Sequence, residues 1–357
     1  HIVEGGFLEN NVVLGNALVD MYAKCGMLEK ACHVLEELPI RNVVSWSALI
    51  DGYAQEGQGH EALECFERMK REGHSPNDVT FISTLKACSN IKDVERGKQI
   101  HNEIVDKYIL EKKIALGNAL VDMYVKCGAL SRAKQVLEEL SVRDIVSWSS
   151  LIAGYAQEGK GHEALDCFEQ MEREGLSADD VTFICILKAC GNLRAIEKGM
   201  QIHDEIIHRD LLKKNVVLGN GLIDMYAKCG MLAKARQVLE ELHVRDVVTW
   251  NALVAGYVQH NQGHEALNCY ERMQREGIAP NGVTFTCVLK ACSSIGAINK
   301  GKQIHDEIIT RGLLEKNIVL GTALVDMYAH CGLFTKAQEV LQELHVRDVV
   351  AWSTLIA

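Results

Sequence analysis

The segment VVSWSALIDGYAQEGQGHEALECFERMKREGHSPN, residues 43–77, predicts two short helices joined by a turn. Its first half repeats apolar side chains at helical spacing, at Trp46, Leu49, Ile50 and Tyr53. Gly57 and Gly59 interrupt this pattern, as glycines do where a helix ends and the chain turns. The second half carries a further apolar stripe, at Ala62, Leu63, Phe66 and Met69. One such pair cannot bury all its apolar surface, so it needs neighbours to stack against.

Those neighbours come from an internal repeat. ALVDMYAKCG at 17–26 returns as ALVDMYVKCG at 119–128, GLIDMYAKCG at 221–230 and ALVDMYAHCG at 323–332, each copy 102 residues after the one before. Each block divides into three helical hairpins of 31, 35 and 36 residues, the first set being 12–42, 43–77 and 78–113. We therefore expect an all-α solenoid with a concave surface, and a function that varies on that surface from copy to copy.

The composition agrees with this expectation. The chain of 357 residues is 48% apolar, enough for a continuous core, and has three prolines. It has no run of about 18 apolar residues, so we expect no membrane span. Residues 1–11 do not look like a signal or transit peptide and align with residues 307–317, so we expect a fragment that begins within a repeat. Thirteen cysteines, mostly at the repeat period and without a CxxC, predict small buried side chains in a reducing compartment.

The motifs that could indicate an enzyme are incomplete. HxE occurs at 101–103, 203–205 and 305–307, but the PCxxC that accompanies it in zinc deaminases is missing. The GHEAL copies lack the second histidine of HExxH. We therefore expect no catalytic residue, no metal and no cofactor in this segment, and predict that the HxE residues are structural or lie on a solvated helix face.

Four tryptophans share one repeat position: Trp46, Trp148, Trp250 and Trp352. An aromatic side chain at fixed helical spacing usually belongs to the core, so we predict burial. Base stacking is the alternative.

The pattern of hairpin lengths resembles that of the pentatricopeptide repeat proteins of plant organelles, in the subclass with alternating short (S), standard (P) and long (L) repeats. VVLGNALVDMYAKCGMLEKACHVLEELPIRN resembles an S repeat, residues 43–77 resemble a P repeat, and DVTFISTLKACSN with GKQIHNEI resembles an L repeat. The tetratricopeptide signature is absent. The resemblance implies a right-handed α-solenoid superhelix. It places S repeats at 12–42, 114–144, 216–246 and 318–348, P repeats at 43–77, 145–179 and 247–281, L repeats at 78–113, 180–215 and 282–317, the tail of an L repeat at 1–11 and a truncated P repeat at 349–357.

The resemblance also implies binding of single-stranded RNA, with one base read by each repeat through its fifth and last residues. The implied base-specifying residues are Asn16, Asn42, Ser47, Asn77, Asn118, Asp144, Ser149, Asp179, Asn220, Asp246, Asn251, Asn281, Thr286, Asn317, Thr322, Asp348 and Ser353. The second residue of each repeat is expected to flank the base, at Val13, Val44, Val79, Ala115, Val146, Val181, Val217, Val248, Val283, Val319 and Val350. These β-branched residues could instead serve packing alone.

The pairs imply a target. Asn with Asn suggests a pyrimidine, Ser with Asn suggests A, Asn with Asp suggests U, and Ser or Thr with Asp suggests G. The L repeats pair Ile82 with Lys113 and Ile184 with Asn215, and isoleucine cannot hydrogen-bond a base. Thr286 with Asn317 would weakly favour A. The expected target is 5′-Y-A-n-U-G-n-U-Y-n-G-R-3′. The scaffold positions barely change between copies whereas these pairs do, which supports recognition over packing.

The charge argues against strong RNA binding. The net charge is −10 and the isoelectric point about 5.8, whereas nucleic-acid binders are usually basic. The resemblance offers phosphate contacts at Lys24, Lys126 and Lys228, which could equally be solvated. We therefore expect modest affinity and a shallow dependence on salt.

Alternatives remain open. The solenoid could bind protein, since L repeats of this subclass engage small organellar editing factors, and both kinds of binding could occur together. A deaminase domain, if the full protein has one, would lie outside this segment. The resemblance implies a chloroplast or mitochondrion, and a role in RNA editing, splicing or stabilisation.

Overall fold

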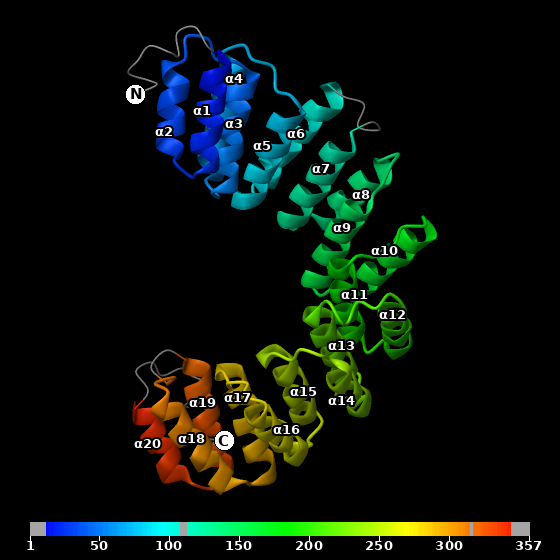
Figure 1. Ribbon diagram of the computed structural model, residues 1–357, viewed down its shortest axis with the longest axis vertical. Coiled ribbons are helices and arrows are strands. Elements are labelled where there is room, and N and C mark those ends of the chain that lie inside the picture. Colours follow the sequence, from blue (N-terminus) through cyan, green and yellow to red (C-terminus); the bar gives the residue numbers. More distant parts are fainter. Residues whose placement is uncertain (1–11, 108–112, 315–316, 344–357) are drawn as a thin grey trace. The chain divides into compact units, whose positions relative to one another are not determined.

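The computed structural model describes residues 12–107, 113–314 and 317–343, and within them it contains twenty α-helices and no strand (Figure 1). The helices are α1 (Val12–Lys24), α2 (Leu28–Glu37), α3 (Val43–Gln55), α4 (Gly59–Arg71), α5 (Asp78–Ile91), α6 (Val94–Lys107), α7 (Ile114–Lys126), α8 (Leu130–Glu139), α9 (Ile145–Gln157), α10 (Gly161–Arg173), α11 (Asp180–Leu193), α12 (Ile196–His208), α13 (Val216–Lys228), α14 (Leu232–Glu241), α15 (Val247–Gln259), α16 (Gly263–Arg275), α17 (Gly282–Ile295), α18 (Ile298–Thr310), α19 (Ile318–His330) and α20 (Phe334–Glu343).

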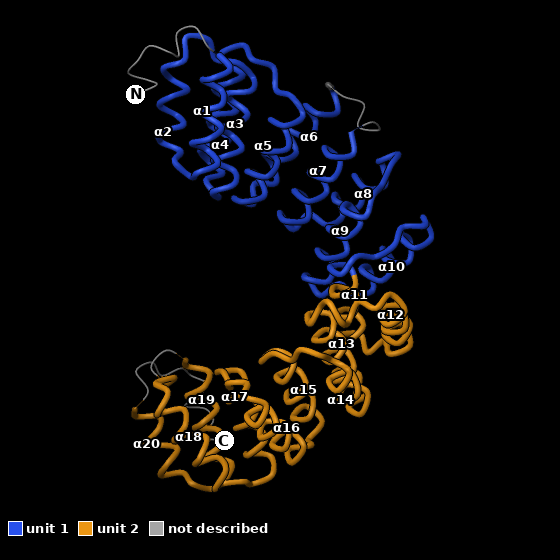
Figure 2. Tube along the Cα trace, in the orientation of Figure 1, with its two compact units in different colours: residues 1–182 blue, residues 183–357 orange. Residues whose placement is uncertain are grey.

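The helices form stacked hairpins. Within each of the two compact units described below, first helices pack on their own second helices and on the first helix of the next hairpin, as α1 does on α2 and α3, and α13 on α14 and α15. First helices therefore make one layer and second helices the other. The predicted all-α solenoid is confirmed. Residues 1–182 and 183–357 form two compact units, and the division between them falls within α11 (Figure 2).

Close packing between first helices depends on glycine. A Cβ added to Gly52 in α3 would lie 2.7 Å from the Cβ of Ala23 in α1. Gly256 in α15 approaches Ala227 in α13 in the same way, at 2.5 Å. The turns inside the hairpins also need glycine: Gly57 has φ of 76°, in the left-handed region. Glycine therefore fixes both the spacing of the layer and the tightness of each turn.

The core lies between the two layers. Trp46, Trp148 and Trp250 are 0–1% exposed, which confirms their predicted burial, whereas Trp352 lies outside the described residues. None of the thirteen cysteines, all of which the structure describes, is in a disulfide. Cys88, Cys167, Cys190 and Cys292 are buried as predicted, and burial raises the pKa of Cys88 to about 12. The prediction is wrong for Cys25, which is exposed, and the cysteines at the same repeat position, Cys127, Cys229 and Cys331, are only half-buried, since each of the four follows the last residue of a first helix at the start of a turn.

The histidines of the HxE motifs join L repeats to S repeats. The ring Nδ1 and the tyrosine hydroxyl lie 2.8–2.9 Å apart in three pairs: His101–Tyr124, His203–Tyr226 and His305–Tyr328. Burial lowers the pKa of each of these histidines. The prediction of a structural role is confirmed. Across the described part of the chain, no three metal-binding side chains gather in one place, and none of its helices is both long and apolar enough to cross a membrane.

Candidate nucleic-acid interface

The last residue of a repeat also caps the first helix of the next. Asn42 precedes α3, and its Oδ1 accepts hydrogen bonds from the backbone amides of Val44 at 2.9 Å and Ser45 at 3.1 Å. The Ser45 hydroxyl accepts a hydrogen bond from the Asn42 amide at 3.0 Å, completing a capping box. The same arrangement occurs at Asn77, Asp144, Asp246 and Asn281. Folding therefore favours Asn or Asp at the last position before any recognition is considered.

The sequence prediction did not include this capping role, although its signal is legible. Asn or Asp stands three residues before Ser or Thr at each of these boundaries, as Asn42 does before Ser45 and Asp246 before Thr249. Ser and Thr at this spacing are a sign of an N-terminal helix cap.

Three of the predicted base-specifying pairs are joined by a direct hydrogen bond. The fifth residue lies one turn into a first helix, and the last residue caps the next first helix. Because these helices pack side by side, the two side chains meet. The pairs, with the distance from the amide nitrogen of the fifth residue to the side-chain oxygen of the last, are Asn118–Asp144 (2.9 Å), Asn220–Asp246 (3.4 Å) and Asn251–Asn281 (3.2 Å).

The two carboxylate oxygens of Asp144 make different contacts: one caps α9, and the other binds the side chain of Asn118. Oδ1 accepts the backbone amide of Ser147 at 3.0 Å and so caps α9, while Oδ2 accepts the amide of Asn118. Burial alone would raise the pKa of Asp144, but the hydrogen bonds from Ser147 and Asn118 outweigh it, and the pKa lies below its usual value. The carboxylate is therefore ionised at neutral pH and can only accept hydrogen bonds, which fixes the orientation of the Asn118 amide.

The other end of this amide carries an unused acceptor. Oδ1 is buried without a hydrogen-bond partner in Asn16, Asn118 and Asn220, the fifth residues of three S repeats. A buried polar atom without a partner costs about 1–3 kcal/mol, and this acceptor recurs at one repeat position, as the unpartnered Nε2 of His101, His203 and His305 does at another. Asn251 of a P repeat differs, because its Oδ1 accepts the hydroxyl of Thr284 at 2.7 Å.

Ser47 and Asn77 are connected through a third side chain. The hydroxyls of Ser47 and Thr80 lie 2.7 Å apart, and the Thr80 hydroxyl donates to Asn77 Oδ1 at 2.9 Å. Thr80 also belongs to the capping box of α5. The structure therefore brings this pair together indirectly.

The pair of Ser149 and Asp179 is arranged differently. The Ser149 hydroxyl donates to the carbonyl of Ile145 within its own helix. Asp179 accepts the amide and the hydroxyl of Thr182, at 2.8 and 2.6 Å. Ser149 thus binds the first turn of α9, and Asp179 binds the first turn of α11; no hydrogen bond between the two side chains is seen in this described part of the chain.

The last S repeat is described only in part. The Thr322 hydroxyl donates to the carbonyl of Ile318 at 3.0 Å, one turn earlier in α19. Its predicted partner Asp348, together with Val350 and Ser353, lies outside the described residues.

The L repeats present a different surface at the fifth position. Ile82 and Ile184 are partly exposed, and the hydroxyl of Thr286 donates to the carbonyl of Gly282 at 2.8 Å. The last residues engage nearby groups: Lys113 forms an ion pair with Asp78, Asn215 accepts the amide of Val217, and Asn317 accepts the amide of Leu320. No amide or hydroxyl pair like that of Asn118 and Asp144 is seen in the described part of these repeats.

The second residues of the repeats are exposed. The exposed fractions are 78% for Val13, 54% for Val44, 55% for Val79, 53% for Val146, 56% for Val181, 49% for Val217, 52% for Val248, 57% for Val283 and 65% for Val319. Ala115 is exposed as well. About half or more of each valine faces solvent, so a role in flanking a base stays a prediction beside the alternative of packing alone. A row of exposed apolar side chains beside the fifth residues suits a flat, apolar ligand.

Each lysine predicted to contact phosphate has an aspartate partner one turn earlier in its helix. The distances from Nζ to the carboxylate are 2.8 Å for Lys24–Asp20, 2.8 Å for Lys126–Asp122 and 2.7 Å for Lys228–Asp224. These pairs are exposed and individually weak. They nevertheless reduce the positive potential that a phosphate would meet.

A regular row of hairpins, stacked through their first helices and differing from copy to copy at the fifth and last positions, places the chain in the class of helical-repeat, or α-solenoid, proteins. Models of two related families match it. The PPR repeat family matches residues 41–90, 143–192 and 245–294, and the PPR repeat matches residues 16–43, 118–145, 220–247, 283–313 and 322–349. The chain belongs to the pentatricopeptide repeat family.

Relatives and solved structures agree with this assignment. A chloroplastic pentatricopeptide repeat-containing protein of Arabidopsis thaliana is 36% identical, over 97% of this chain and 56% of its own length. A mitochondrial one from the same plant is 37% identical, over 98% of this chain and 34% of its own length. The chain thus spans about half or less of these relatives. The crystal structure of PPR10 in complex with an 18-nt psaJ RNA element is similar in fold, with a TM-score of 0.80 at 16% identity over 96% of this chain and 52% of that one.

Proposed function

We propose that the chain binds single-stranded RNA and reads one base with each S and P repeat through the fifth and last residues. The observation that carries this proposal is the hydrogen bond between Asn118 and Asp144, with its counterparts in two other repeats, beside a row of exposed valines. The fold of PPR10, solved with an RNA element, supports it. The proposed target is 5′-Y-A-n-U-G-n-U-Y-n-G-R-3′.

The orientation of the Asn118 amide supports the choice of U. Because Nδ2 donates to the Asp144 carboxylate, Oδ1 is left to accept a hydrogen bond from the ligand. Uracil carries a donor at N3, whereas cytosine carries an acceptor there and donates only from its exocyclic N4, so an acceptor that meets N3 fits uracil and not cytosine. Asn220 has the same free acceptor, and its repeat is assigned U as well.

The Asn251 repeat presents the opposite pattern. Its Oδ1 is already occupied by the Thr284 hydroxyl, and only its amide nitrogen retains a hydrogen to donate. Cytosine, which offers an acceptor at N3, suits this site better than uracil. Within the pyrimidine assigned to this repeat, we favour C.

Fluorescence anisotropy tests the proposal. The matched RNA is 5′-CAAUGAUCAGA-3′, and the control is 5′-ACAGAUGAAUC-3′, which has the same composition and a mismatch at every assigned base. Strong preference for the matched RNA at two salt concentrations supports base reading. Equal binding that disappears with salt would leave only charge contacts and would reject it.

A second candidate function is the binding of proteins through the L repeats. Ile82 and Ile184 are partly exposed and cannot hydrogen-bond a base, so this position suits an apolar protein contact better than an RNA base. Small organellar editing factors are the proposed partners. Replacing both isoleucines by serine should lower the affinity for such a partner protein and leave RNA binding unchanged. Weaker RNA binding with an unchanged affinity for the partner would reject this candidate.

The cellular setting is proposed from relatives, some of which are named chloroplastic or mitochondrial. We infer that the chain is the RNA-recognition part of a plant organellar protein that edits or processes RNA. Fluorescent tagging of the full-length protein tests this location, and a purely cytosolic signal would reject it.

A further inference from the structure

The residue before the last one is arginine in all four S repeats, and three of these arginines, Arg41, Arg143 and Arg245, lie in the part of the chain that the structure describes. We propose that these arginines are positioning residues for base recognition: each holds the loop that carries the neighbouring last residue where it meets the fifth. The inference rests on the proposed reading of RNA bases. It concerns residues that would act through their neighbours Asn42, Asp144 and Asp246.

Each arginine first fastens the loop to the helix that precedes it. Arg245 Nε donates to the carbonyl of Leu239 at 2.8 Å, and Nη2 donates to the carbonyl of Glu240 at 3.3 Å. These carbonyls belong to the last turn of α14, which has no intrahelical partners for them. The other copies repeat the contacts: Arg41 with Leu35 and Glu36 (both 3.0 Å), and Arg143 with Leu137 (3.0 Å) and Glu138 (3.2 Å).

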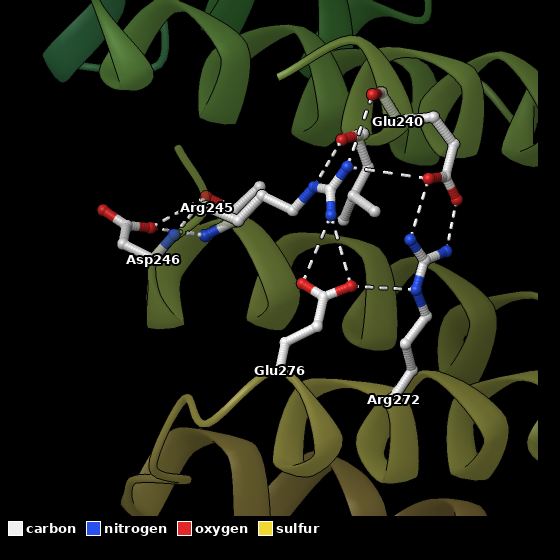
Figure 3. A network of polar contacts seen from close by, with 7 residues as sticks. Glu240, Arg245, Asp246, Arg272 and Glu276 are labelled. Carbon is white, nitrogen blue, oxygen red and sulfur yellow. Dashed lines mark hydrogen bonds and ion pairs between the residues drawn. The ribbon is translucent and has the colours of Figure 1, made fainter. Parts of the chain in front are cut away.

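The same guanidinium then fastens the loop to the following repeat. Arg245 Nη1 lies 3.2 and 3.3 Å from the two carboxylate oxygens of Glu276, the C-cap residue that follows α16. Glu276 also accepts Arg272 Nε at 3.0 Å, and Arg272 reaches Glu240 at 2.8 Å, which closes a ring of four charges (Figure 3). The Arg245 and Glu276 side chains are 21% and 27% exposed, so solvent screens them less than a surface pair.

The middle copy shows which part of the network is constant. Gln170 occupies the place of Arg68 and Arg272, so the ring is not closed there. Glu174 still binds Arg143, and its other oxygen accepts the indole nitrogen of Trp148 at 3.0 Å. The ring therefore varies between copies, whereas the link from the arginine to the helix end and to the glutamate is kept in all three.

Each of the three described S-repeat loops begins at a buried leucine, Leu38, Leu140 or Leu242, and the arginine anchors its far end, next to the last residue. The residue before each arginine is exposed, at 63% for Ile40, 51% for Val142 and 68% for Val244. In the P repeats the position before the last residue is instead held by a buried apolar side chain, at Pro76, Ala178 and Pro280. A guanidinium that bridges two carbonyls and a carboxylate thus does in S repeats what burial does in P repeats.

The test compares base preference at two nucleotides in the full chain. Arg245→Gln removes the bridge beside Asp246, and four RNAs that vary nucleotide 7 of 5′-CAAUGAUCAGA-3′ measure its effect on the Asn220–Asp246 site. A second set that varies nucleotide 4 reports the untouched Asn118–Asp144 site. Arg275→Gln is the matched control, because Arg275 lies in α16, makes the same charge change and is exposed.

We expect Arg245→Gln to reduce the preference for U at nucleotide 7 about tenfold, the factor that corresponds to one lost hydrogen bond, and to leave the preference at nucleotide 4 unchanged. Arg143→Gln should do the reverse. Arg245→Lys should not restore the preference, since an ammonium group cannot reproduce the forked bridge. Loss of affinity that is equal for all RNAs, or an unchanged preference at nucleotide 7, would overturn the inference. If the unmodified chain shows no preference at nucleotide 7, the proposed function fails instead.

Discussion

Replacing Asp144 by asparagine should change the base that its repeat accepts from U to C. In the native pair, the carboxylate holds the Asn118 amide with Nδ2 inward and Oδ1 free. An asparagine at 144 can keep its oxygen on the Ser147 amide, as the cap requires, and would then turn its own NH2 group toward Asn118. Two donors would face each other unless Asn118 rotates its amide. After that rotation Asn118 offers a donor to the base, which matches N3 of cytosine.

The size of the effect follows from the atoms that exchange roles. A neutral hydrogen bond contributes about 1 kcal/mol, and a buried donor left facing a donor costs about 1–3 kcal/mol. Since 1.4 kcal/mol is a factor of ten, the ratio of U to C binding should fall by roughly ten- to a hundredfold. Stability should change little, because asparagine and aspartate are similar N-caps. Recognition is thereby separated from folding.

The assay is anisotropy with four RNAs that differ only at nucleotide 4 of 5′-CAAUGAUCAGA-3′. A second set that differs at nucleotide 7 is the control, because Asp246 is untouched. The expected result is a preference that moves from U to C at nucleotide 4 and stays with U at nucleotide 7. An unchanged preference at nucleotide 4, or a shift of equal size at both nucleotides, would show that Asp144 does not set the base that its repeat accepts.

The remaining predictions concern stability and charge. Trp148→Ala should lower the free energy of unfolding in urea by about 3–5 kcal/mol, since the side chain is 1% exposed; a loss below about 1 kcal/mol would contradict its place in the core. Burial lowers the pKa of His101, His203 and His305, so the unfolded chain binds more protons and stability should fall as the pH drops below about 6.5. A variant with all three replaced by glutamine should lose less stability between pH 7.5 and 5.5, and an identical pH profile would count against the buried histidines. Lys126→Ala should weaken all RNAs alike and lower the salt slope by no more than about one, because Asp122 already neutralises part of its charge; a change in base preference would show that Lys126 does more than contact phosphate.

Much of the fold could be predicted because the apolar pattern of each helix recurs in the equivalent helices of the other 102-residue blocks. Trp46, Trp148 and Trp250 share one position, and a mistake about one copy would have been visible in the others. The same reasoning gave a wrong prediction for Cys25. Its periodic position predicted burial, but exposure depends on which hairpin covers the turn, and that is a property of packing rather than of the pattern.

The positions of the candidate base-specifying residues could be predicted from the sequence, but the hydrogen bonds between them could not. The resemblance to known repeats named Asn118 and Asp144, but their hydrogen bond depends on how closely α7 and α9 pack. The link from Ser47 through Thr80 to Asn77 passes through a residue of the next repeat and needs the structure to be seen. The partner of Lys126 is different: Asp122 lies four residues earlier, a spacing at which opposite charges meet on a helix, so this pairing was visible in the sequence.

Selection from a pool of RNAs with eleven randomised nucleotides tests most directly whether each repeat reads one base. The account predicts a profile with strong preference for U, G and U at nucleotides 4, 5 and 7, and with no preference at nucleotides 3 and 6, where the fifth residues are Ile82 and Ile184. A flat profile, or preferences that ignore this spacing, would contradict it.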